Sequence, residues 1–317
     1  NNKKSIEDLN KGISHVPEPA LREMIQAGVE GKKISGSTSY ESILDSDVVL
    51  VTVGTPLSED FDADLSAITD VFKNLSEYIL EGQIIMVKST VPPGMTRKMA
   101  NKFLADRKNI FIGFSPERLA EGVAIDEFRS FPIVVGGIND ESTEQCAKFW
   151  SSTLGVEVIK VSSCEAAELV KLADNQWVDL NVALANELAI LCDSLPYDLD
   201  VLEIIRGANS LKKGQHYVNI LTPSIGVGGY CLTKDPWFLS ALGDKNGANM
   251  KLPRAGRSVN DMMPGYAANQ IFDHLRAINA TLDETKLAVL GYSFKSNSGD
   301  IRFTPMKNFI DEITEIV

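Results

Sequence analysis

Short apolar runs rich in Val and Ile recur through the first half of the chain and alternate with stretches of helical periodicity. Such runs are typical of strands that are buried on both faces of a parallel sheet. Residues 64–80 and 96–106 have the period of amphipathic helices, the usual crossovers of a doubly wound α/β domain. The pattern therefore predicts an α/β domain over residues 1–160, with strands at 47–53, 83–87, 109–113, 132–136 and 156–161.

The second half of the chain has a mainly helical pattern. Ser163 is a suitable N-cap, and residues 165–191 contain no Gly or Pro while apolar residues return at steps of three and four, which predicts one long helix. A second helical stretch over 255–277 is interrupted by the pair Pro264 and Gly265, and the run 286–291 has the pattern of a buried strand.

These elements predict a central helical domain over 161–278 and the beginning of a second α/β domain over 279–317. No GxGxxG turn occurs before residue 40, so we expect the first strand and glycine-rich turn of the first domain to precede this sequence. An α/β unit with one strand has little to pack against, so we also expect the second α/β domain to continue beyond Val317.

Charge and composition exclude several function classes. The chain has 31 Lys and Arg against 43 Asp and Glu, and a net charge of −12 is the wrong sign for binding nucleic acid or an anionic membrane. No apolar run approaches the roughly 20 residues that span a bilayer, and residues 1–4 lack a hydrophobic signal core, so we expect a cytoplasmic protein. The four cysteines form no CxxC pair and the three histidines lack ligand spacing, so no metal site is predicted.

The segment GVGGYCLTKDPWF, residues 226–238, contains a candidate nucleophile. Three glycines precede Cys231, and Lys234 and Asp235 follow it. Glycines let a ligand or a second backbone come close, and Lys234 can lower the pKa of the thiol and so raise the fraction of thiolate that attacks a carbonyl. The alternative is a small buried Cys231 within a glycine turn.

Two further groups of polar residues could serve in chemistry. Glu168, Lys171 and Asn175 project from one face of the long helix and could hold an oxyanion, unless this face is solvated and carries only a Glu–Lys pair. Glu117 and Glu121, in FSPERLAEG after a strand, could act as general bases or could only complement a helix dipole.

Three loops after strands offer candidate binding groups. The segments VTVGTP and KSTVPPG provide small polar groups at one sheet edge, although ordinary turn chemistry explains them equally well. The segment GYSFKSNSGDIRF contains two cations, Lys295 and Arg302, that suit a diphosphate, although a surface loop also accounts for them.

Seven segments in this order closely resemble the UDP-glucose/GDP-mannose dehydrogenase family of nucleotide-sugar 6-dehydrogenases, through nearly the whole chain. They are LNKGISHVPEPAL, VTVGTPL, KSTVPPG, FSPERLAEG, ELVKLADNQWVDLNVALANEL, GVGGYCLTKDPWF and GYSFKSNSGDIRF. The resemblance implies a Rossmann-like NAD-binding domain, a helical dimerisation domain and the start of a UDP-sugar-binding domain. It also implies oxidation of the sugar C6 alcohol to a carboxylate with two NAD molecules, in a homodimer or higher homo-oligomer.

The resemblance assigns five catalytic positions. Cys231 matches the nucleophile, which would form a thiohemiacetal and then a thioester. Lys171 and Asn175 match the residues that stabilise the charge on oxygen. Glu117 matches the base proposed for hydrolysis, and Asp235 matches the carboxylate beside the nucleophile.

Binding positions are assigned by the same resemblance. Those matched to the cofactor are Gly54, Thr55, Pro56, Ser89, Thr90, Glu121, Lys234 and Arg302. Those matched to the substrate are Arg118, Leu119, His216, Gly228, Tyr230, Arg257, Asn260, Phe294 and Lys295. In the family, positions equivalent to His216, Arg257 and Asn260 sometimes reach the substrate from the neighbouring subunit.

The segment NQWVDLNVALANEL resembles the branch that acts on N-acetylated sugars, and DPWF after the cysteine is most similar to enzymes for UDP-N-acetyl-D-mannosamine. Tyr230 departs from that branch, which usually has His at this position. The alternatives are a 6-dehydrogenase for UDP-N-acetylglucosamine or UDP-glucose, a β-hydroxyacid dehydrogenase that needs no cysteine, and an inactive fragment that binds sugar nucleotides.

Overall fold

The computed structural model describes residues 2–16, 18–58, 62–214, 216–281, 285–296 and 298–316. The chain divides into two compact units, Asn1–Leu172 and Ala173–Val317. The three-domain division expected from the sequence stays a prediction.

The first unit contains a five-stranded sheet with the strand order β1-β2-β3-β4-β5. Its helical elements are α1 (Lys3–Asn10), α2 (Leu21–Glu30), the 3₁₀ helix η1 (Tyr40–Asp45), α3 (Ser66–Tyr78), α4 (Met95–Phe103), α5 (Ala124–Ser130) and α6 (Asp140–Leu154). Its strands are β1 (Val48–Val51), β2 (Ile84–Val87), β3 (Phe111–Phe114), β4 (Ile133–Gly137) and β5 (Val158–Lys160). All five predicted strands are therefore confirmed, each trimmed or shifted by one to three residues.

The sheet is mixed, and this corrects the prediction of a parallel sheet. β1 pairs with β2, β2 with β3 and β4 with β5 in parallel, but β3 and β4 are antiparallel, with Gly113 opposite Gly137 and Phe114 opposite Gly136. The reason is that a continuous apolar run reports burial on both faces and does not report the direction of the strand.

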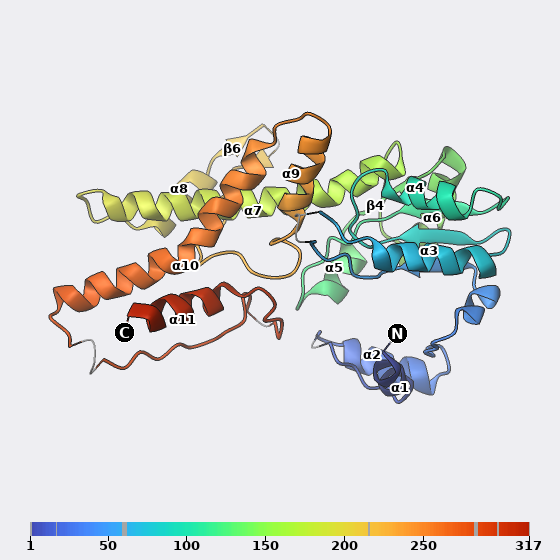
Figure 1. Ribbon diagram of the computed structural model, residues 1–317, viewed down its shortest axis with the longest axis horizontal. Coiled ribbons are helices and arrows are strands. Elements are labelled where there is room, and N and C mark those ends of the chain that lie inside the picture. Colours follow the sequence, from blue (N-terminus) through green and yellow to red (C-terminus); the bar gives the residue numbers. More distant parts are fainter. Residues whose placement is uncertain are drawn as a thin grey trace. The chain divides into compact units, whose positions relative to one another are not determined.

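Helices cover both faces of this sheet, as Figure 1 shows. Successive side chains of a strand point to opposite faces, and β2 demonstrates this. Ile85 and Val87 pack in a cluster with Phe72 of α3, whereas Met86 packs in a second cluster with Trp150 of α6. The result is the Rossmann-like α/β sandwich that the apolar runs predicted.

The long helix α7 (Cys164–Ser194) is confirmed as one uninterrupted element and is the yellow-green helix of Figure 1. Ser163 caps it, because its Oγ accepts the N–H of Ala166 at 3.2 Å. Cys164 and Ala167, in the first turn, are buried in the sheet core. The long helix therefore begins within the core of the first unit.

The second unit contains α8 (Val201–Asn209), the short antiparallel strands β6 (Lys212–Lys213) and β7 (His216–Tyr217), α9 (Asp235–Lys245), α10 (Lys251–Ala277) and α11 (Pro305–Ile316). α10 packs on α11 through a cluster that includes Ala268, Phe272 and Phe309. Among the described residues, the longest helices are not apolar enough to qualify as membrane spans.

Two sequence predictions fail in this unit. α10 continues through Pro264, which was expected to interrupt it. Proline removes one hydrogen bond of the helix, but Pro264 and the neighbouring Met263 are buried, and packing outweighs this local cost. Residues 286–291 form no strand, and the Leu290 side chain is almost fully exposed. An apolar run becomes a strand only where a neighbouring strand completes its hydrogen bonds, and none of the described strands pairs with this run.

Candidate active site

Cys231 lies in the turn that precedes α9 and is the exposed member of the four free cysteines. Its carbonyl oxygen accepts the backbone N–H of Lys234 at 3.1 Å and of Asp235 at 2.9 Å, so the turn is tied to the first residues of the helix. Burial raises the pKa of Cys146 and of Cys164 to about 12, which keeps these thiols protonated. The alternative of a buried structural Cys231 is therefore wrong.

The glycines before Cys231 admit a second backbone segment. A Cβ at Gly228 would lie 2.5 Å from the Cβ of Phe294 and 2.9 Å from the carbonyl oxygen of Phe303. Gly229 has φ +88° and donates its N–H to the carbonyl of Arg302 at 3.1 Å. This close approach confirms one of the two uses expected of the glycines, and it places the loop that leads to α11 against the turn that contains Cys231.

A buried polar cluster lies directly after Cys231. The carboxylate of Asp235 is fully buried and accepts hydrogen bonds from Asn175 Nδ2 and from Lys234 Nζ, the latter at 2.6 Å. The ammonium of Lys234 also lies 4.5 Å from the ring centroid of Phe238. The charge of Lys234 is thus compensated by Asp235, and its effect on the pKa of Cys231 stays a prediction.

A second buried network ties α7 and α10 to the same turn. Arg257 Nη1 donates to Asp179 Oδ1 at 2.9 Å and to the carbonyl of Leu232 at 3.4 Å. Asn260 Nδ2 donates to Asp179 Oδ1 at 2.9 Å, and its Oδ1 accepts Asn186 Nδ2 at 3.0 Å. Burial raises the pKa of Asp179, and the positive charge of Arg257 opposes that shift.

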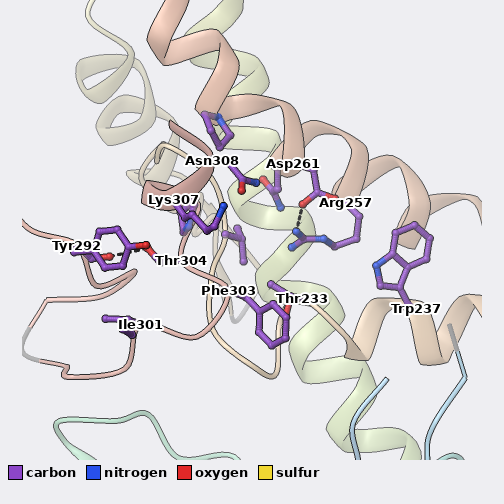
Figure 2. A pocket seen from close by; sticks show the side chains of 14 residues that line it. Thr233, Trp237, Arg257, Asp261, Tyr292, Ile301, Phe303, Thr304, Lys307 and Asn308 are labelled. Carbon is purple, nitrogen blue, oxygen red and sulfur yellow. Dashed lines mark hydrogen bonds and ion pairs between the residues drawn. The ribbon is translucent and has the colours of Figure 1, made fainter. Parts of the chain in front are cut away.

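Arg257 and Asn260 also line a cavity of about 390 Å³ (Figure 2). Figure 2 shows Arg257 bonded to Asp261 on α10, while Lys307 and Asn308 of α11 line another part of the wall. The cavity also contains apolar and hydroxyl groups from the loop before α11, among them Tyr292, Ile301, Phe303 and Thr304. Its volume lies within the range of small-molecule sites, and its lining combines charged, hydroxyl and apolar side chains.

The remaining sequence-predicted residues of this unit differ in their surroundings. The guanidinium of Arg302 forms a bidentate ion pair with Asp300 and lies 5.3 Å from the ring centroid of Tyr230. His216 is exposed on β7. Thus Tyr230, Gly228, Phe294 and Arg302 are grouped around the glycine turn, and their binding roles, like that of His216, stay predictions.

In the first unit, the segments VTVGTP and KSTVPPG, which lie at the ends of β1 and β2, contact each other. Thr55 Oγ1 donates to the carbonyl of Thr90 at 2.6 Å, and Ser89 is buried with its Oγ 3.4 Å from the carbonyl of Val51. A Cβ built at Gly54 would meet no atom within 4 Å. This edge of the sheet therefore combines fixed small polar groups with open space beside the backbone.

Glu117 lies in an irregular loop after β3. Its Oε1 accepts the N–H of Leu119 at 3.0 Å, and its Oε2 lies 3.3 Å from Lys88 Nζ. Arg118 donates to the carbonyl of Pro132. Glu121 is exposed in the turn before α5 and lies outside that helix, so neither Glu117 nor Glu121 sits in a first helical turn.

The face of α7 that was singled out in the sequence is buried, so the alternative of a solvated face is wrong. Glu168 is fully buried and accepts the N–H of Gly94 at 2.6 Å and of Thr96 at 2.8 Å. Burial raises the pKa of Glu168 to about 7, and its bonds to Thr96 and Gly94 oppose the rise. Lys171 and Asn175 follow on the same helix and are also buried.

Sequence reasoning missed Lys88 and Asp179, although the position of each in a local sequence pattern could have identified it. Lys88 follows the apolar run of β2 directly, and a charge at the end of a buried strand often belongs to a site at that sheet edge. Asp179 is four residues after Asn175, on the face of α7 that also presents Lys171.

Family comparisons cover both units. Residues 1–153 match the NAD binding domain of the UDP-glucose/GDP-mannose dehydrogenase family. Residues 165–262 match the central domain of the same family.

Individual relatives agree with this match. A UDP-N-acetyl-D-mannosamine dehydrogenase of Methanococcus vannielii is 32% identical over 316 residues, which cover 98% of this chain and 70% of the relative. The solved structure of a UDP-D-ManNAc dehydrogenase of Pyrococcus horikoshii has a TM-score of 0.90 at 31% identity and covers 100% of this chain and 74% of that chain. A UDP-glucose dehydrogenase of Pyrobaculum islandicum has a TM-score of 0.85 at 25% identity and covers 99% and 72%.

Proposed function

The chain belongs to the UDP-glucose/GDP-mannose dehydrogenase family, and from this premise we propose that it oxidises the C6 alcohol of a UDP-sugar to a carboxylate with NAD. The substrate we propose is UDP-N-acetyl-D-mannosamine, and the product is the corresponding uronate. The names of the relatives from Methanococcus and Pyrococcus support this choice over UDP-glucose, as does the segment NQWVDLNVALANEL in α7.

The observation that carries the proposal is the exposed thiol of Cys231 directly before the buried Asp235 cluster. In a four-electron oxidation that does not release its aldehyde intermediate, a nucleophile must hold C6 on the enzyme between the two oxidations. Cys231 is accessible to a substrate, and its turn is fixed by the backbone bonds to Lys234 and Asp235. A β-hydroxyacid dehydrogenase would leave this thiol without a use.

The proposed oxidation has four steps. The alcohol loses a hydride and a proton to give the aldehyde, and the thiolate of Cys231 adds to C6 to form a thiohemiacetal. Loss of a second hydride gives a thioester, and attack by water breaks the C–S bond and returns the thiolate. Overall, alcohol and water give the carboxylate, two hydrides and three protons.

Polar residues of this chain stabilise the charge on the C6 oxygen and activate the water that cleaves the thioester. In this mechanism the donors of Lys171 and Asn175 stabilise the negative charge on the C6 oxygen, an effect worth about a hundred- to a thousandfold in rate per donor. Asp235 holds the amide of Asn175 in place through its buried hydrogen bond. Glu117 accepts a proton from the water that cleaves the thioester, and general bases of this kind contribute about a hundred- to ten-thousandfold.

The carboxyl edge of β1 and β2 fits the nicotinamide end of NAD. The open space beside Gly54 allows a ring to lie against the backbone, and Thr55, Ser89 and Thr90 supply fixed hydroxyl and carbonyl groups. Gly54, Thr55 and Ser89 would hold the nicotinamide there, and the chemistry that NAD would supply is a hydride acceptor for each oxidation. The residues of the chain supply the orientation of the ring and the exclusion of water.

We also propose a homodimer or higher homo-oligomer in the cytoplasm. Trp177, Leu184 and Leu191 are exposed apolar side chains at seven-residue steps along α7, which places them in one stripe. A stripe of this length is suited to burial against a second copy of the helix. The free state of all four cysteines agrees with a reducing compartment.

The test is the number of NADH molecules formed per sugar consumed. The purified protein is given UDP-N-acetyl-D-mannosamine, UDP-N-acetylglucosamine or UDP-glucose, and NADH and uronate are measured together. Two NADH per UDP-N-acetyl-D-mannosamine and little turnover of the other two are expected. One NADH, or none with any UDP-sugar, would overturn the four-electron mechanism.

A further inference from the structure

Lys88 presents a buried ammonium at the carboxyl end of β2. The side chain is 9% exposed, and its Nζ lies 3.3 Å from Glu117 Oε2 and 3.5 Å from the carbonyl oxygen of Ser115. The same nitrogen lies 5.1 Å from the ring centroid of Trp150, which packs under the sheet. These contacts hold the ammonium at one place.

Electrostatics couples this ammonium to Glu117. Burial lowers the pKa of Lys88, and the negative charge of Glu117 opposes that shift, while the positive charges of Lys171 and Arg118 reinforce it. A buried ammonium requires a partner charge, because leaving water without one is costly. Among the described residues, Glu117 supplies the carboxylate that bonds to Lys88.

Glu117 in turn has both carboxylate oxygens engaged. Oε1 accepts the N–H of Leu119, and Oε2 faces Lys88. The side chain is nevertheless 44% exposed, so water can reach it. A carboxylate that is held at both oxygens and open to water has the geometry of an oriented base.

We propose that Lys88 is the positioning residue for Glu117 and holds its carboxylate in the orientation that activates water for cleavage of the thioester. The proposal rests on the function proposed above and adds a residue to it. It assigns Lys88 to the hydrolytic step, because the carboxylate that its ammonium bonds is that of the hydrolytic base.

The test compares the oxidation and hydrolysis steps in Lys88→Met, which keeps the length of the side chain and removes its charge. A burst of two NADH per active site should remain, whereas steady-state turnover should fall about ten- to a hundredfold, since a general base is worth about a hundred- to ten-thousandfold. Intact-mass analysis of quenched enzyme should show a sugar adduct on Cys231. Lys88→Arg, which keeps the charge, should recover most of the turnover.

A double-mutant cycle distinguishes positioning from a purely structural role. Glu117→Gln should slow hydrolysis, and the addition of Lys88→Met should slow it no further, because the two residues act as a unit. Lys160→Met is the matched control: Lys160 forms an exposed pair with Glu144 at 2.7 Å, and its loss should change neither step.

Three results would overturn the proposal: wild-type hydrolysis in Lys88→Met, loss of its NADH burst, or independent effects that multiply in the double variant. If Lys88→Met does not fold, Lys88→Gln replaces it, because a neutral amide also removes the charge that faces Glu117 and should also accumulate the adduct. Wild-type turnover by Lys88→Gln would then refute the proposal. Failure of the wild-type protein to oxidise any UDP-sugar would instead refute the proposed function.

Discussion

Replacement of Glu168 tests how the long helix α7 is attached to the sheet. Its buried carboxylate accepts the N–H groups of Gly94 and Thr96, where α4 begins. Glu168→Ala leaves both donors without a partner, and each unsatisfied buried group costs about 1–3 kcal/mol. We therefore expect Glu168→Ala to lower the free energy of unfolding by about 2–6 kcal/mol.

Glu168→Gln gives a sharper test, because it removes the charge and retains one acceptor oxygen. Burial raises the pKa of Glu168 to about 7 from the ordinary value of 4.5. A raised pKa means that the folded state binds the proton more tightly, so this stability is present below about pH 4.5 and is lost as the pH rises through 7. With about 1.4 kcal/mol per pKa unit, the loss is on the order of 3 kcal/mol. Gln does not titrate and should show no such loss.

The assay is urea unfolding at pH 5, 6, 7 and 8, followed by the fluorescence of Trp150. This tryptophan is buried in the first unit, and Trp177→Phe with Trp237→Phe removes the other two signals. As the pH rises, the free energy of unfolding of the Glu168→Gln variant should increase relative to that of the wild-type protein. Most of this change should occur between pH 5 and 7. A difference that stays constant across this range would refute the reasoning. Glu144→Gln, at an exposed position, is the control.

Three further predictions concern the nucleophile, the buried ion pair and the core. Cys231→Ser should lose uronate formation at least a hundredfold while releasing aldehyde that a hydrazine reagent captures; unchanged production of two NADH per sugar would contradict the thioester route. Asp235→Asn leaves the ammonium of Lys234 buried without its partner charge, so urea unfolding should show a loss of about 3–5 kcal/mol, and a loss below 1 kcal/mol would count against the pair. Phe72→Ala removes a fully buried ring and should cost about 3–5 kcal/mol by the same measurement, whereas Phe131→Ala, at an exposed position, should cost far less.

Much of the fold could be read from local patterns because burial acts on neighbouring residues along the chain. The run from Ile84 to Val87 is apolar at every position since both faces of β2 are covered, and α7 forms over its full length because no Gly or Pro interrupts its pattern. Cys231 was a candidate for a similar reason, since the three glycines and the lysine that suit a reactive thiol are its neighbours along the chain.

Other features depended on contacts between distant segments, which no local pattern contains. The reversed direction of β4, the passage of α10 through Pro264 and the absence of a strand at 286–291 were all decided by what packs or pairs beside each element. The same holds for Glu168, whose bonds reach back more than seventy residues to Gly94. The sequence by itself determined the strands of the first unit, the extent of α7 and which residue types could do the chemistry. Only the tertiary structure decided their partners, because hydrogen bonds and ion pairs form between groups that folding brings together.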